Sequence, residues 1–163
     1  MICRDNHILL KGINVYTEDG IIENGYIKIK DQRISGIGPL DDLSPNIEGI
    51  TMFEIPTNFN AVPGFIDVHI HGVGGADTMD ATKEALDTMV TALPKEGTTS
   101  FLATTMTQEN KSIEKVLMVT GKYIDEQIPQ GKAEVLGIHL EGPFVNPKMA
   151  GAQPIQHIID PDL

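Results

Sequence analysis

The chain has 163 residues, of which 40% are hydrophobic, enough for one globular domain or for a small domain with part of another. Its 23 acidic and 12 basic side chains give a formal net charge of -11 at pH 7, which argues against nucleic acid or an anionic membrane surface as a partner. Cys3 is the only cysteine, so no intrachain disulfide can form. Because no signal-peptide or membrane-spanning pattern is present, we expect a cytoplasmic protein.

Residues 1–60 are predicted to form a small layer of short β-strands. In "GYIKIK" isoleucine alternates with lysine, the period of a half-buried strand, and the preceding "TEDG" is typical of a turn between two strands. The polar stretch "DDLSPNIEG" is expected to be a connection at the edge of this layer. A further short strand is expected around Met52 to Ile55.

After Pro63 the pattern changes to strands that alternate with helices. The strands are expected in "GFIDVHIHG", "TTSFLATTM" and "AEVLGIHLEGPF". A first helix is expected to begin with Asp80 as its N-cap, and a second covers "NKSIEKVLMVTGKYIDEQ". Each helix has one apolar stripe, made of Ala85, Leu86, Met89, Val90 and Leu93 in the first and of Ile113, Val116, Leu117, Tyr123 and Ile124 in the second. This alternation predicts parallel βαβ units and therefore an α/β fold.

Two histidines at the end of the first of these strands indicate a metal site. His69 and His71 are two residues apart, so both side chains point to the same face of a strand. Glu141 follows the third strand, and in a parallel α/β fold the carboxyl ends of the strands carry the active site. Two imidazoles and a carboxylate suit a divalent transition metal.

Other interpretations of these residues remain open. A His-x-His pair on a strand is often incidental, and Glu141 could cap a nearby loop. His139 is either an ordinary hydrogen-bonded histidine or a residue that supports the metal site from outside the ligand set. The glycine-rich "GVGG" after His71 fits neither a phosphate-binding Walker loop nor the dinucleotide-binding fingerprint.

Three motifs in this order, "VPGFIDVHIHGVGG", "GTTSFLATTMT" and "GIHLEGPFVNPKMAGAQP", closely resemble the N-acetylglucosamine-6-phosphate deacetylases of the amidohydrolase superfamily. The resemblance implies a (β/α)8 TIM-type barrel with metal at the carboxyl ends of its strands and a small β-sandwich built from both chain ends. Residues 1–60 would then be the N-terminal part of the sandwich. Residues 61–163 would hold about the first three βα units of an incomplete barrel.

The resemblance also implies roles for individual residues. His69, His71 and Glu141 would bind one or two divalent metal ions, with zinc or iron expected. Ala152 and Gln153, in the "GAQP" segment, would bind the sugar substrate. The family's catalytic aspartate would lie beyond Leu163, so no residue is assigned to the catalytic base.

The expected function of the complete protein is hydrolysis of the acetamide of N-acetylglucosamine 6-phosphate, a small-molecule amino sugar phosphate, to glucosamine 6-phosphate and acetate. The complete protein is expected to be a homodimer, and the 163-residue chain alone to be inactive. "IIDPDL" reads as the start of a helix, so we expect the chain to be the N-terminal part of the enzyme. The alternatives are an amidohydrolase that acts on cyclic amides, as dihydroorotases do, and a non-catalytic folded module.

Overall fold

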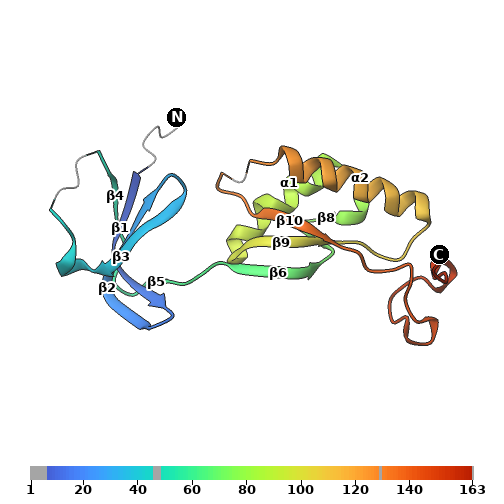
Figure 1. The fold of residues 1–163 in the computed structure, drawn as a ribbon, viewed down its shortest axis with the longest axis horizontal. Coiled ribbons are helices and arrows are strands. Elements are labelled where there is room, and N and C mark those ends of the chain that lie inside the picture. The colour runs from blue at the N-terminus through green and yellow to red at the C-terminus, as the bar shows by residue number, and fades with distance from the viewer. Residues whose placement is uncertain (1–6, 46–48, 129, 163) are drawn as a thin grey trace. The chain divides into compact units, whose positions relative to one another are not determined.

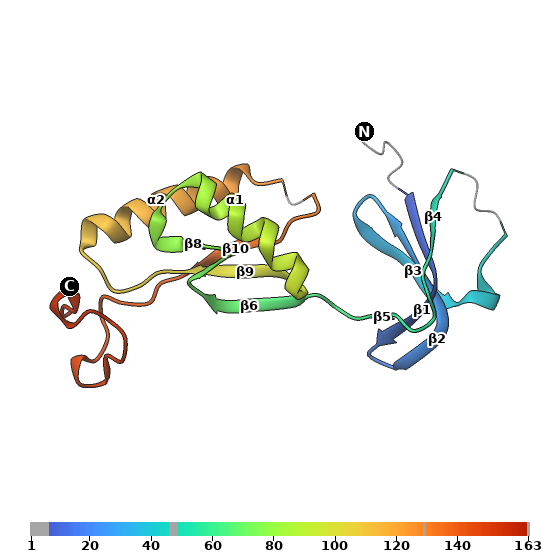
Figure 2. The same cartoon turned by 180° about the vertical axis from the view of Figure 1, so that it is seen from behind.

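The computed structural model describes residues 7–45, 49–128 and 130–162. Cys3 and part of the expected connection "DDLSPNIEG" lie outside the described residues. The chain divides into two compact units, Met1–Pro63 and Gly64–Leu163, which are drawn in Figures 1 and 2. No helix in the described part of the chain is long and apolar enough to span a membrane.

The first unit is built on one β-sheet. Its strands are β1 (His7–Thr17), β2 (Gly20–Lys30), β3 (Arg33–Pro39), β4 (Thr51–Glu54) and β5 (Asn60–Ala61). The strand order is β3-β2-β1-β4, and β5 also pairs with β1. β2 pairs antiparallel with both β1 and β3. Thr17 faces Gly20 across the "TEDG" turn, which confirms the predicted connection. Ile13, Val15 and Ile27 form the buried core of this sheet.

The second unit places two helices against a parallel sheet. Its elements include β6 (Phe65–Ile70), α1 (Lys83–Ala92), β9 (Thr98–Thr104), α2 (Asn110–Glu126) and β10 (Glu134–His139). The strand order is β10-β9-β6, with both pairs parallel. Both helices cover the same face of the sheet in Figures 1 and 2. The predicted βαβ alternation is confirmed, and the fold is mixed α/β.

The core of the second unit lies between these helices and the sheet. The α1 stripe is confirmed, since all five of its predicted residues are buried. In the α2 stripe Ile113, Val116 and Tyr123 are buried, whereas Leu117 and Ile124 are partly exposed. β9 contributes Phe101 and Ala103, both at 0% exposure, to the cluster packed against α1.

The predicted start of the first helix at Asp80 is wrong. The helix begins after Thr82, whose hydroxyl accepts a hydrogen bond from the Ala85 amide at 3.2 Å. Asp80 instead ends a short 3-10 turn, Thr78–Asp80, and accepts from the Asp77 amide at 2.9 Å. Ala81, at φ 50°, has left-handed backbone that a continuous helix cannot contain. Both aspartate and threonine are good N-caps, so their types alone do not separate the two positions.

The glycine-rich stretch after His71 is a small hairpin rather than an open loop. β7 (Gly72–Val73) pairs antiparallel with β8 (Ala76–Asp77). The two residues between them, Gly74 and Gly75, have φ values of 67° and 82°. Positive φ at both central residues is the requirement of a tight two-residue hairpin turn, which explains the paired glycines.

Candidate metal centre

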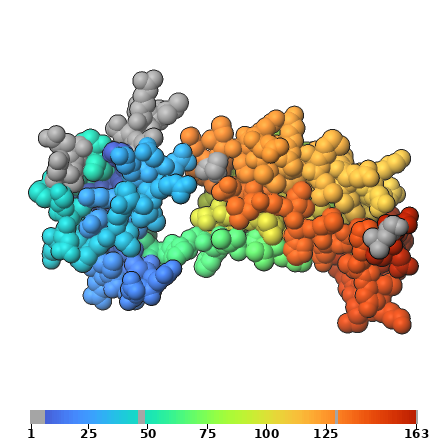
Figure 3. All heavy atoms as spheres, in the orientation of Figure 1, coloured from blue at the N-terminus to red at the C-terminus, as the bar shows by residue number. Residues whose placement is uncertain are grey.

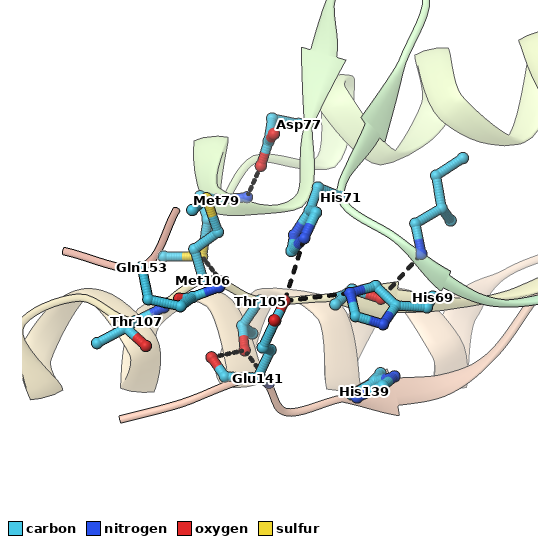
Figure 4. A network of polar contacts seen from close by, with 12 residues as sticks. His69, His71, Asp77, Met79, Thr105, Met106, Thr107, His139, Glu141 and Gln153 are labelled. Carbon is cyan, nitrogen blue, oxygen red and sulfur yellow. Dashed lines mark hydrogen bonds and ion pairs between the residues drawn. The ribbon is translucent and has the colours of Figure 1, made fainter. Parts of the chain in front are cut away.

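His69, His71 and Glu141 meet at the carboxyl ends of β6 and β10, as Figure 4 shows. One ligand atom from each lies within 4.8 Å of the other two. Nε2 of His69 is 3.1 Å, and Nε2 of His71 3.2 Å, from the same carboxylate oxygen, Oε2 of Glu141. Residues 72 positions apart in the chain are thus joined because parallel strands end at the same edge of the sheet.

The backbone around these residues is held by side chains. Oδ1 of Asp67 accepts a hydrogen bond from the His69 amide at 3.0 Å. The hydroxyl of Thr104 accepts from the Ile70 amide, and the hydroxyl of Thr105 accepts from the Glu141 amide, each at 3.0 Å. The ends of β6 and β10 are therefore both attached to the end of β9.

The donor set fits a divalent transition metal. Two imidazole nitrogens and a carboxylate oxygen are ligands that zinc and iron accept. Nδ1 of His71 is buried and has no hydrogen-bond partner among the described residues, so only Nε2, turned toward Glu141, offers this ring an interaction. The three side chains are 26–45% exposed, which leaves room for further ligands.

His139 lies next to the cluster without joining it. Its Nδ1 is 2.9 Å from the Val68 carbonyl oxygen, so this nitrogen is the donor of the hydrogen bond. The ring centroid of His139 is 4.5 Å from that of His69. His139 is thus a hydrogen-bonded histidine whose ring packs against that of the candidate ligand His69, so both interpretations of it stay open.

The two predicted substrate residues belong to the segment that follows Glu141. This segment extends past the carboxyl ends of the strands in Figure 1 and forms the red lobe of Figure 3. Ala152 is exposed. Gln153 is half-buried, and its Oε1 accepts a hydrogen bond from the Thr107 amide at 2.8 Å. In Figure 4 Gln153 and Thr107 lie close to Thr105 and Glu141, but neither Ala152 nor Gln153 belongs to the cluster of His69, His71 and Glu141.

Gly142 makes a close approach directly after Glu141. Its φ is +78°, and a Cβ added there would lie 2.0 Å from Oγ1 of Thr107. Only glycine allows both this backbone conformation and this contact. The position of Glu141 therefore depends on its small neighbour.

One cavity lies away from the three candidate ligands. It measures about 550 Å³, is lined by residues of α1, α2 and the loop before β10, and includes none of the three candidate ligands. At its edge Asp87 binds Lys83, Lys132 and the hydroxyl of Tyr123. The pKa of Asp87 is lowered to about 2, mainly by the hydrogen bond from Lys83. The pKa of Tyr123 is raised, first by burial and second by its hydrogen bond to Asp87. Since the basic groups are already paired, we interpret this network as a link between helices and place the chemistry at the histidines.

Comparison with known proteins identifies the family of the chain. Residues 60–161 match the model of the Amidohydrolase family. The chain belongs to this family. It is 46% identical over 157 residues to the N-acetylglucosamine-6-phosphate deacetylase of Bacillus subtilis, and 39% identical over 156 residues to that of Lysinibacillus sphaericus. These matches cover 96% of the chain but only 39% and 38% of the two relatives, so the chain spans less than half their length.

A solved structure to which this chain is similar is the N-acetylglucosamine-6-phosphate deacetylase from Pasteurella multocida. The structural match has a TM-score of 0.82 at 25% identity, and it covers 94% of this chain and 38% of the other. The resemblance stated from the three sequence motifs is thereby confirmed. Family membership also strengthens the metal interpretation, because the cluster could hold the ion on which amidohydrolases generally depend.

Sequence reasoning missed the roles of Thr104 and Thr105. Their hydroxyls contact the backbone beside His71 and at Glu141, yet in the sequence they belong to a strand rich in threonine, where β-branched residues are ordinary. Their position in the sequence could have indicated these roles, because they stand at the end of the central strand, next to the strand ends that lead to the candidate ligands.

Proposed function

We propose that this chain is part of a metal-dependent deacetylase that hydrolyses N-acetylglucosamine 6-phosphate to glucosamine 6-phosphate and acetate. The observation that carries the proposal is the meeting of His69, His71 and Glu141 at one carboxylate oxygen in an amidohydrolase fold. The names of the relatives supply the substrate class. We further propose that the enzyme is a cytoplasmic homodimer.

In this proposal β6, β9 and β10 are the first three strands of a (β/α)8 barrel. Their parallel sequential order, with both helices on one face, supports it. The sheet of the first unit would be the N-terminal part of the small β-sandwich. The further metal ligands and the carboxylate that acts as general base would come from later strands of the complete protein.

The residues of this chain have defined tasks at the reacting centre. The Nε2 atoms of His69 and His71 both face Glu141, so these three residues would hold the ion from the ends of two strands. A bound divalent ion, zinc or iron, as one ion or two, would supply the Lewis acidity that activates water and polarises the acetamide carbonyl. His139 keeps the His69 ring in place from outside the ligand set.

Ala152 and Gln153 are proposed to bind the amino sugar phosphate. Because the Thr107 amide holds the amide oxygen of Gln153, the orientation of the side-chain amide is set. Its NH2 group is then oriented to donate to a sugar hydroxyl or a phosphate oxygen. The segment 141–162 would bring this donor to the same end of the sheet as the metal.

The test is acetate release from N-acetylglucosamine 6-phosphate by the complete protein. We expect turnover that disappears when a chelator strips the metal, returns when zinc or iron is added, and is absent in the His69→Ala/His71→Ala variant. Undiminished turnover after verified metal removal would contradict the metal assignment. Turnover of cyclic amides in place of the sugar phosphate would favour the dihydroorotase-like alternative.

The 163-residue chain alone is expected to be inactive. Loss of a general acid/base typically costs a factor of about 10²–10⁴ in rate, and here the remaining ligands would be lost as well. Purified chain, supplied with metal, should release acetate only at background. Turnover within about a hundredfold of the complete protein would show that the base lies in this chain.

A further inference from the structure

The hydroxyls of Thr104 and Thr105 add side-chain bonds at the end of the sheet, where the Thr105 amide also donates to the His139 carbonyl at 3.0 Å. The ladder from β9 to β6 ends with Ala103 opposite Ile70, and the ladder to β10 ends with Thr104 opposite His139. At this end the Ile70 amide donates to Thr104 Oγ1 and the Glu141 amide donates to Thr105 Oγ1. Side chains thus hold the strands together up to the candidate metal ligands.

Both hydroxyls are fixed in direction. Thr104 Oγ1 also donates to the Leu102 carbonyl at 3.2 Å, and Thr105 Oγ1 donates to the Glu141 carbonyl at 3.4 Å. Both threonines are 0% exposed, so water does not compete for these bonds. Each hydroxyl therefore acts as acceptor and donor in one defined rotamer.

The amides that they hold belong to the ligand-bearing segments. Ile70 lies between His69 and His71, and Glu141 is itself a candidate ligand. Metal–ligand distances are specified to within about 0.2 Å, so a small displacement of either strand end alters the fit of an ion. β9 supplies no candidate ligand to this cluster, yet it contacts both segments that do.

We propose that Thr104 and Thr105 are positioning residues of the metal centre: their hydroxyls, through the amides of Ile70 and Glu141, set the separation between the histidine pair and the carboxylate. The inference rests on the proposed function, because it takes the three-residue cluster to be a metal site. It concerns how the ligands are held rather than which residues they are.

Two conservative replacements separate hydrogen bonding from packing. In the complete protein, Thr104→Val/Thr105→Val keeps the side-chain shape and removes both hydroxyls, whereas Thr104→Ser/Thr105→Ser keeps the hydroxyls and removes a methyl group. We expect the valine pair to weaken zinc binding about 10–100-fold, the usual cost of losing support around ligands, and the serine pair to bind zinc like the parent. A packing role predicts the reverse order. Zinc affinity is measured on metal-stripped protein by competition with a chromogenic chelator.

Thr78→Val is the matched control. Thr78 is 2% exposed, and its hydroxyl has no hydrogen-bond partner among the described residues. The same replacement there removes a buried hydroxyl without breaking a bond. Zinc affinity is expected to equal that of the parent.

A second measurement does not depend on metal. Amide hydrogen exchange of Ile70 and Glu141 in the metal-free protein should become faster in the valine pair and stay protected in the serine pair. If the double valine variant does not fold, the single Thr105→Val and Thr105→Ser variants decide by the same criterion at Glu141.

The outcomes separate the two proposals. A parent protein that binds neither zinc nor iron removes the proposed function, and the inference falls with it; a parent that binds only iron is tested in the same way with iron. A parent that binds zinc, with a valine pair that binds it equally well or with unchanged exchange at both amides, overturns the inference alone.

Discussion

β9 and β6 lie side by side in one sheet, yet they differ in burial and in chemistry. β9 has Phe101 and Ala103 at 0% exposure and carries no candidate ligand, whereas β6 leaves Phe65 65% exposed and carries His69. β10, the other outer strand, leads to Glu141. The packed strand is thus a different strand from the two that lead to candidate ligands, and hydroxyls at its end hold the ends of those two strands.

The largest effect should separate a phenylalanine of the central strand from one of an outer strand. Phe101→Ala removes a fully buried ring from the core and is expected to lower the free energy of unfolding by about 3–5 kcal/mol. Phe65→Ala, at an exposed position, should change it by about 0.5 kcal/mol or less. Urea unfolding followed by circular dichroism measures both. If both variants lost the same unfolding free energy, the difference in burial between Phe101 and Phe65 would not determine their contributions to stability.

A second prediction concerns the ligand carried beyond β10. Glu141→Gln keeps the shape of the side chain but removes its negative charge. Zinc affinity should fall by more than about a hundredfold, which exceeds the usual cost of losing a residue that only supports a ligand. Glu134→Gln, at the exposed start of the same strand, is the control and should bind zinc like the parent. Isothermal titration of metal-stripped protein gives both affinities. Similar affinities for the two variants would remove Glu141 from the ligand set.

A third, smaller effect concerns the helix layer over β9. The pKa of Asp87 is lowered from 3.8 to about 2, so its ionised form stabilises the folded state above pH 3.8, and this stabilisation is lost as pH falls toward about 2. Because the side chain is 35% exposed, screening limits the contribution to about 1 kcal/mol. Asp87→Asn should lack this component of acid sensitivity. The difference in unfolding free energy between parent and variant, measured above and below this window, should shrink at low pH; a constant difference would contradict the pairing.

The smallest expected effect lies in the segment after Glu141. Gln153→Ala removes the proposed donor to the substrate, and a single hydrogen bond of about 0.5–1.5 kcal/mol corresponds to a rise of about 2–10-fold in KM. Metal content should not change. The exposed neighbour Gln156 provides the control variant Gln156→Ala, which should leave KM as it is. If Gln153→Ala leaves KM unchanged as well, Gln153 only holds the loop through Thr107.

The alternation of strands and helices could be predicted from the sequence because hydrophobic periodicity reports which face each element buries. The meeting of His69 with Glu141 could also be anticipated, since parallel strands end at one edge. The hairpin at Gly72 was within reach, as two successive glycines mark such turns. The helix start was not, because the backbone conformation of Ala81 decides between two capable caps.

The partners of the threonine hydroxyls could not be predicted. Residue type shows that a threonine suits a strand, but it does not show which backbone amide its hydroxyl will meet. That depends on the register of three strands, including the irregularities between Asp67 and Ile70 and between Val135 and Gly137. Long-range register is a property of the assembled sheet.

The close contact of Gly142 with Thr107 has a consequence for how this protein tolerates mutation. A side chain at residue 142 must either push Thr107 aside or leave the left-handed backbone, and either change moves the carboxylate of Glu141. In a library that varies each position in turn and selects for growth on the substrate, residue 142 should therefore be as intolerant as a ligand, although it offers no ligand atom. Replacements at Gly121, where an added Cβ meets nothing within 4 Å, should survive the same selection.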